Sequence, residues 1–284
     1  MAELMQIRQR ISAIATIKKI THAMRLISMS SHTRLKTQEQ ALTVYTKTLA
    51  ALFNKAKSQV SDWRNPILQP VETEQPSHLV ILVGSDKGLC GNFNTTLFYF
   101  FEEYLPSYNL ENTIFIAIGK KAIDYLEQKK KIIPSLVYRQ FTATTLPAIA
   151  QALIDHISLK PTPYTSVTIF SNILKSFFQQ KPERTQLIPF QAPESATLDT
   201  QSADFYFEQP AIEVVNFLAE QVLKGSLDYL LFQSLIAEQA ARFISMDSST
   251  RNADRLLEQT KLLYNKLRQA TITKELAELT GSFQ

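Results

Sequence analysis

The distribution of proline limits the folds open to this chain. All twelve prolines lie between Pro66 and Pro210, so neither residues 1–65 nor residues 211–284 contain one. Proline removes a backbone donor and clashes with the preceding helical turn, which ends or kinks a helix. Both ends of the chain can therefore be uninterrupted helices, which would run roughly 85 Å and 100 Å at 1.5 Å per residue. Helices that long need each other or an outside partner to bury their apolar faces.

A seven-residue recurrence of apolar side chains predicts that these helices pair as a coiled coil. In the first helix one column is interrupted by Thr21 and Ser28, and a second column is offset from it by three positions. The polar stretch 28–40 indicates a length that is less tightly covered by protein or is held by polar contacts. The columns are Ile7, Ile14, Leu35, Leu42, Leu49 and Ala56; Ile17, Met24, Tyr45 and Leu52; and, near the end of the chain, Leu256, Leu263, Ala270 and Ala277.

The middle of the chain has a different period. Short runs rich in β-branched and aromatic residues alternate with helical patterns, which predicts βαβ units and a mainly parallel sheet. The strand candidates are 78–84, 113–118, 135–140, 164–170 and 185–190, and the helical patterns are 94–105, 119–131 and 146–158.

The simplest fold class is α/β, with a Rossmann-like domain inserted between two long terminal helices that form an antiparallel coiled coil. The ends of the inserted domain then lie close together, as domain termini commonly do. We expect an N-terminal helix within 1–65, an α/β domain over 66–210 and a C-terminal helix within 211–284. The proline map further predicts continuous helix over 4–58 and 212–276.

A glycine-rich turn, GSDKGLCG at residues 84–91, follows the first predicted strand and precedes a helix. Such a turn can cradle phosphate on its backbone donors. Its glycine spacing matches neither the dinucleotide fingerprint nor the P-loop, and Lys87 is not followed by Ser or Thr. The mismatch favours a tight structural turn over a phosphate site.

The remaining chemistry of the sequence is sparse. The four histidines and Cys90 form no metal-ligand pair and no nucleophile–base constellation, so we expect no metal, no cofactor and no catalytic residue. Cys90 is expected to be a packed small hydrophobe, and one cysteine cannot form an intrachain disulfide. The sequence contains no run of 18 apolar residues, so we expect no direct membrane insertion. A net charge of +4 and a row of cations in residues 8–36 fit a solvated face or an acidic protein partner better than nucleic acid.

Three segments of the chain together resemble one family. They are IRQRISAIATIKKITHAMRL at residues 7–26, GSDKGLCGNFN at residues 84–94, and the region 234–281, which holds SLIAEQAARFISMDSSTRNA and YNKLRQATITKELAELTG. In this order and near these ends, they resemble the gamma subunit of F-type ATP synthases.

The resemblance implies a non-catalytic rotor shaft that couples ion flow through a membrane ring to ATP synthesis or hydrolysis. The implied partners are the alpha and beta subunits of the F1 ring, the epsilon subunit and the membrane c-ring, with no nucleic acid among them. The implied location is peripheral, on the cytoplasmic face of a bacterial inner membrane. By the same resemblance, Met24 and Arg242 match positions that face the ring, and Arg268, Gln269 and Thr273 match a segment that reaches its catch loops.

The sequence departs from the family pattern in places. The stretch 30–36 replaces an Ala- and Lys/Arg-rich segment, His22 stands where Lys is common, Asn92 stands where Gly is common, and Arg251 lies within an MDxATxNA-like stretch. These departures indicate a divergent branch of the family. Two other classes remain open on the residues alone: a coiled-coil adaptor with a Rossmann-like ligand domain, and a small α/β enzyme with helical arms. The enzyme would need a polar pocket at the carboxyl edge of the sheet, where Asp86 and Lys87 are the candidates.

Overall fold

The computed structural model describes residues 2–60, 63–65, 67–70, 76–160, 162–190 and 207–281. It divides into two compact units. Unit 1 combines the two ends of the chain, Met1–Ser30 and Arg242–Gln284, and unit 2 is Ser31–Ala241. The sequence predicts three consecutive segments, 1–65, 66–210 and 211–284, whereas these units group residues by contact and join the two ends of the chain. The division into three segments stays a prediction.

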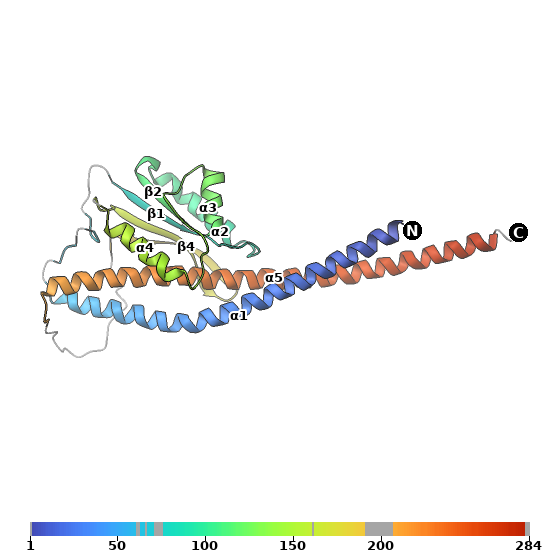
Figure 1. Ribbon diagram of the computed structural model, residues 1–284, viewed down its shortest axis with the longest axis horizontal. Helices are drawn as coiled ribbons and strands as arrows, with labels where there is room; N and C mark the ends of the chain where they lie inside the picture. Colours follow the sequence, from blue (N-terminus) through green and yellow to red (C-terminus); the bar gives the residue numbers. More distant parts are fainter. Residues whose placement is uncertain are drawn as a thin grey trace. The chain divides into compact units, whose positions relative to one another are not determined.

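Two long helices run through the terminal segments (Figure 1). Helix α1 spans Ala2–Ser58 and helix α5 spans Ala211–Gly281, so the continuous helices predicted from the absence of proline are confirmed, without a break in the polar stretch 28–40. The one glycine inside α5 before its final residue, Gly225, lies where α5 meets α1 closely. A Cβ atom built there would lie 3.4 Å from the Thr46 side chain.

Five strands form one sheet in the order β3-β2-β1-β4-β5. The first four are parallel and β5 pairs antiparallel with β4, which confirms a mainly parallel sheet. The strands are β1 (His78–Val83), β2 (Thr113–Ile118), β3 (Leu136–Tyr138), β4 (Ser166–Ser176) and β5 (Gln179–Ile188).

The sheet is covered on both faces, as expected for parallel strands with helical crossovers. Alternate residues of β1 divide between the two cores because side chains of a strand alternate in direction. Leu79 and Ile81 pack with the unit-2 parts of α1 and α5 and with helix α4 (Leu146–Ser158), whereas Val80 and Leu82 pack with α2 (Phe93–Tyr104) and α3 (Lys120–Asp124). In Figure 1, α4 likewise lies between the sheet and α5.

The structure differs from the predicted elements mainly around the last two strands. The runs at 164–170 and 185–190 are parts of a longer hairpin, in which β5 begins at Gln179 and includes Pro182. An edge strand tolerates proline because its outward positions need no donor. The helical pattern at 119–131 becomes α3 followed by a π-helical segment, Tyr125–Lys130, and the strand predicted at 135–140 is reduced to three residues.

Candidate functional site on the paired helices

In unit 1, polar contacts fix the register between α1 and α5. Thr250 donates a hydrogen bond to the Thr21 hydroxyl (3.0 Å), Arg25 Nη1 lies 2.7 Å from Asp247 Oδ1, and Lys18 pairs with Asp254. The two residue numbers in each pair sum to 271 or 272, because the position along α5 falls as the position along α1 rises. The helices are therefore antiparallel, as predicted, and Lys18 and Arg25 of the cationic row have acidic partners within the chain.

The buried side of α1 in unit 1 includes the two residues that interrupt the first apolar column. Ile14, Thr21 and Ser28 are all buried, and Thr21 hydrogen-bonds across the pair as well as to the Lys18 carbonyl. The buried column therefore continues through Thr21 and Ser28, and Thr21 makes a polar contact across the pair. Within the polar stretch 28–40, Gln233 of α5 donates to Glu39 of α1, which supports the second alternative, a length held by polar contacts.

The late column of Leu256, Leu263, Ala270 and Ala277 does not form the buried seam, because all four residues are exposed. The second column of α1 is mixed: Ile17 and Tyr45 are exposed, whereas Met24 and Leu52 are half-buried. On α5 the buried seven-residue series is instead Met246, Ala253 and Thr260. A narrow seam of one column per helix leaves apolar side chains facing outward. The exposed apolar residues of unit 1 are Met5, Ile17, Ile20, Leu26, Ile27, Met29, Leu256, Leu262, Leu263, Ile272 and Leu276.

The end of α5 extends beyond the start of α1. By the register above, the first residues of α1 lie level with about residue 270 of α5, and α5 continues to Gly281. Figure 1 shows the C-terminal end passing the N-terminal one. Residues near Ile272 and Leu276 therefore belong to a single helix with exposed apolar side chains, which is unusual for a surface without a partner.

The five predicted contact residues all lie in unit 1 but differ in exposure. Arg268, Gln269 and Thr273 are exposed on α5, and Met24 is half-buried on α1. Arg242 is 5% exposed, so the chain itself covers most of it. By the register, Met24 lies level with about residue 248, which places it beside the Arg25–Asp247 pair and roughly 9 Å along the axis from Arg242.

The glycine-rich turn in unit 2 is filled from within. The Ser85 N–H donates to Asn94 Oδ1 (3.0 Å), and Asn94 Nδ2 donates to Ser85 Oγ and toward Cys90 Sγ. Asp86 accepts a hydrogen bond from the Lys120 N–H at the start of α3. Cys90 is buried with Phe93, Ala237 and Ala241, so it packs as a small hydrophobe as predicted.

The described part of the chain offers neither a metal centre nor a membrane span. Among those residues no group of three or more histidines, cysteines and carboxylates is placed to hold a metal ion. No described helix is long and apolar enough to cross a membrane.

Known proteins of one family resemble this chain over almost its whole length. The sequence model of the ATP synthase family matches residues 3–284. The ATP synthase gamma chain of Clostridium perfringens is 31% identical over 285 residues, covering 99% of this chain and 97% of the relative. The gamma chain of Flavobacterium psychrophilum is 31% identical over 287 residues, covering 99% and 98%.

Solved structures agree with this chain in fold. One is a chain from a structure of the OSCP, F1 and c-ring of the Euglena gracilis mitochondrial ATP synthase. It superposes with a TM-score of 0.67 at 15% identity, covering 99% of this chain and 94% of that one. A chain of the Tetrahymena thermophila central stalk and c-ring gives a TM-score of 0.55 at 19% identity, covering 81% and 98%.

Paired terminal helices with an inserted α/β sheet define the class of fold to which this chain belongs. The chain belongs to the ATP synthase gamma chain family, whose members are the non-catalytic rotor subunits of the central stalk.

Proposed function

We propose that the paired helices of unit 1 turn inside a ring of alpha and beta subunits, and that this rotation couples ion flow through a membrane c-ring to ATP synthesis or hydrolysis. The epsilon subunit and the c-ring contact the α/β sheet unit. The assembly is peripheral, on the cytoplasmic face of a bacterial inner membrane. The observation that carries the proposal is the exposed apolar surface of unit 1, above all the single-helix end of α5.

Exposed apolar side chains suit a turning contact. Leu262, Ile272 and Leu276 gain from burial in any rotational position, since the hydrophobic effect is not directional. Salt bridges would instead favour particular orientations and would have to break at each step. An end lined by apolar side chains therefore supports a bearing around residues 262–276, with Arg268, Gln269 and Thr273 as its polar contacts.

The two helices also differ in chemistry, and this difference is what lets rotation act on catalysis. Identical catalytic subunits bind nucleotide differently only if the shaft contacts their open and closed states with different free energies. A pair with cations on α1 and a single-helix overhang on α5 presents a different face to each subunit. Met24, half-buried beside the Arg25–Asp247 pair, lies at one such face.

Met24→Lys tests this role. The new ammonium adds a cation beside Arg25, where it competes for Asp247 or seeks an acidic group on the ring. A charge-assisted hydrogen bond to the ring of roughly 1.5–3 kcal/mol would have to break during rotation, which slows a step about tenfold or more. We expect retained ATP hydrolysis with a reduced ratio of pumped ions to ATP in reconstituted vesicles, and no such change in Met24→Leu. An unchanged ratio in Met24→Lys would remove Met24 from the contact set.

A further inference from the structure

Among the residues that the structure describes, the sheet of unit 2 ends in a short strand whose outer edge is unpaired. Strand β3 pairs with β2 on one side only, and it is terminal in the strand order. Gly119 donates its N–H to the Tyr138 carbonyl, so the backbone of Tyr138 faces β2. Because successive residues of a strand alternate in the direction of their backbone groups, Val137 turns its N–H and C=O toward the open edge.

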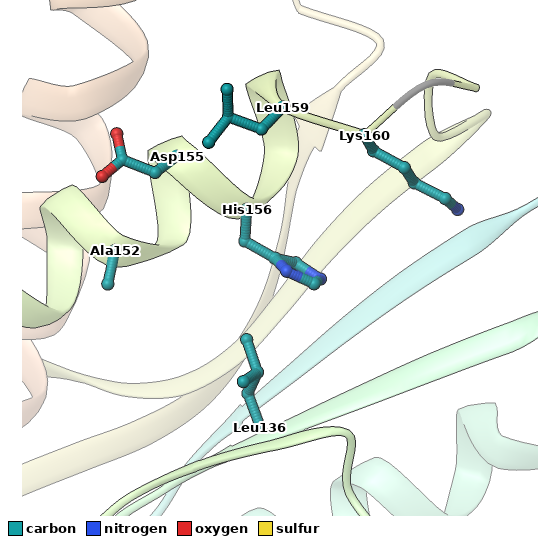
Figure 2. Close-up of a pocket in the computed structure, with 6 residues that line it drawn as sticks. All are labelled: Leu136, Ala152, Asp155, His156, Leu159 and Lys160. Atoms are coloured by element: carbon teal, nitrogen blue, oxygen red, sulfur yellow. The ribbon is translucent and has the colours of Figure 1, made fainter.

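A hollow lies beside this edge, between β3 and α4. It has a volume of about 380 Å³ and is lined by Leu136, Ala152, Asp155, His156, Leu159 and Lys160. Figure 2 shows Ala152, Asp155 and His156 of α4 above Leu136 of β3, with Leu159 and Lys160 just after the end of the helix. A strand added beside β3 would direct alternate side chains to the same face of the sheet as Leu136, which is the face toward this hollow.

The polar groups around the hollow already have partners. His156 Nε2 lies 2.9 Å from the Tyr164 hydroxyl, Asp155 accepts a hydrogen bond from Gln151 (2.8 Å), and Lys160 donates to Ser77 (2.8 Å). The walls left over are the aliphatic side chains of Leu136, Ala152 and Leu159. The hollow therefore suits an apolar side chain better than a polar small molecule.

Apolar side chains around the edge are unusually exposed. Ile133 is 87% exposed, Leu159 is 80% exposed and Val137 is 43% exposed. Natural sheets protect an open edge with charges, proline or a bulge, because unpaired backbone groups recruit other strands. Strand β3 is short and follows Pro134, which limits pairing to a few backbone groups, but its own side chains are apolar and the charges stand at its two ends.

The positive charge around β3 favours a partner segment that carries negative charge. The segment 120–139 contains six cations and two carboxylates, a net charge of +4, which equals that of the whole chain. Lys129 and Lys131 precede β3, whereas Lys120 and Arg139 lie near its other end, next to the Gly119–Tyr138 hydrogen bond. Lys130, between the first two, is already paired with Glu102 (2.7 Å). Positive charge thus flanks an apolar edge on both sides.

We propose that the β3 edge is a docking site for an extended acidic segment of a partner protein, which adds as a sixth strand. Its backbone pairs with Val137, one apolar side chain enters the hollow against Leu136 and Leu159, and its acidic ends meet the flanking lysines and Arg139. This is strand addition to a sheet edge, in which main-chain bonds give affinity and alternate side chains give specificity. The surface lies in unit 2, and the proposal does not depend on the turning role proposed for unit 1.

A synthetic peptide with Val, Leu and Val at alternate positions and two acidic residues at each end is the probe. Calorimetric titration is made on the full chain and on Val137→Pro and Val137→Thr. Proline removes the outward N–H at a position where an edge strand tolerates it, whereas threonine keeps that donor and the β-branch. We expect saturable binding to the native chain and to Val137→Thr, and binding at least about tenfold weaker to Val137→Pro.

A second measurement does not rely on the proline variant folding. Hydrogen exchange of the native chain should slow at the Val137 amide when the acidic peptide is added. The peptide with lysine in place of its four acidic residues should bind at least about tenfold more weakly, with a difference that shrinks in high salt.

Three results would overturn the proposal. The first is that the acidic peptide binds Val137→Pro and Val137→Thr equally well and does not slow hydrogen exchange at the Val137 amide of the native chain. The second is equal affinity for the acidic and basic peptides. The third is self-association of the native chain that Val137→Pro abolishes, which would make a second copy the occupant.

Discussion

At the scale of single residues, the pairing of α1 with α5 in unit 1 is determined by polar side chains within an apolar repeat. Thr21 and Thr250 meet in the seam, and Ser28 is 1% exposed. A buried hydroxyl is costly unless it is hydrogen-bonded, so each such contact favours one register over its neighbours. The apolar period predicts that the helices pair, but the register depends on pairs such as Arg25–Asp247, which no single helix reveals.

The Arg25–Asp247 pair predicts a pH dependence of stability. The hydrogen bond from Arg25, followed by the charges of Arg251 and Arg25, lowers the pKa of Asp247 below its usual 3.8, although partial desolvation opposes this. A lowered carboxyl pKa adds stability that is complete above the unfolded value and is lost as the pH falls below about 4. The difference in thermal unfolding between the native chain and Asp247→Asn should therefore be largest at pH 6 and should narrow steadily as the pH falls below about 4. A gap that stays constant over this range would contradict the assignment.

Asn94 is the residue that closes the glycine-rich turn. Asn94→Ala leaves the Ser85 N–H without its acceptor in a buried site, which should cost about 1–3 kcal/mol of unfolding free energy. Asn92→Ala is the matched control, because Asn92 is exposed and makes no side-chain cap bond. Urea denaturation measures both. Equal losses in the two variants would show that the turn does not need the Asn94 contacts.

At the scale of elements, the β4–β5 hairpin ties the sheet to α1 within unit 2. Phe177 at its turn packs edge-on against His32 of α1, with ring centroids 4.9 Å apart. Nearby, Gln233 of α5 donates to Glu39 of α1, so polar contacts also hold this end of the stretch 28–40.

His32 should make unit 2 less stable in mild acid. Burial lowers the pKa of His32, with a contribution from Lys36, whereas the backbone of Ile236 and the charge of Glu39 raise it less. The unfolded chain then binds the proton more tightly, so stability falls as the pH drops below about 6.5. The difference in unfolding free energy between the native chain and His32→Gln should change between pH 7.5 and 5.5. His156 is present in the native chain and in His32→Gln alike, so it does not contribute to the difference between them. A difference in unfolding free energy that does not change with pH would exclude His32 as the cause.

The hairpin also marks the limit of what the sequence predicts. The strands at 78–84 and 113–118 are predictable because they are continuous apolar runs buried on both faces. Only the last part of strand β5 is predicted, within the run 185–190. Its first part carries Lys181, Glu183 and Arg184 and is largely exposed, so neither hydrophobicity nor period identifies it. Its pairing with β4 depends on the tertiary structure and not on the local sequence. The column predicted from Leu256 onward is exposed for a related reason, because a heptad count alone does not say which column faces the partner helix.

At the scale of the whole molecule, family membership and structure give the chain a mechanical role. The three sequence segments that resemble the family predict this membership correctly, and the matches cover 97–98% of the length of the relatives. The contacts of Met24, Arg242, Arg268, Gln269 and Thr273 stay a prediction, because they concern partner chains. Arg242 is the least accessible of the five, so we expect it to act by holding the helix pair in place.

Rotation of this chain against the catalytic ring is the central claim, and a single-molecule assay tests it directly. A bead is attached through Tyr99→Cys, since Tyr99 is 66% exposed whereas the native Cys90 is 3% exposed and reacts poorly. The chain is assembled with its alpha and beta subunits, and the ring is fixed to a surface. The complex that carries only Cys90 controls for stray attachment. The account predicts that added ATP drives continuous rotation of the bead in one direction. A complex that hydrolyses ATP while the attached bead stays fixed, or only fluctuates without direction, would contradict it.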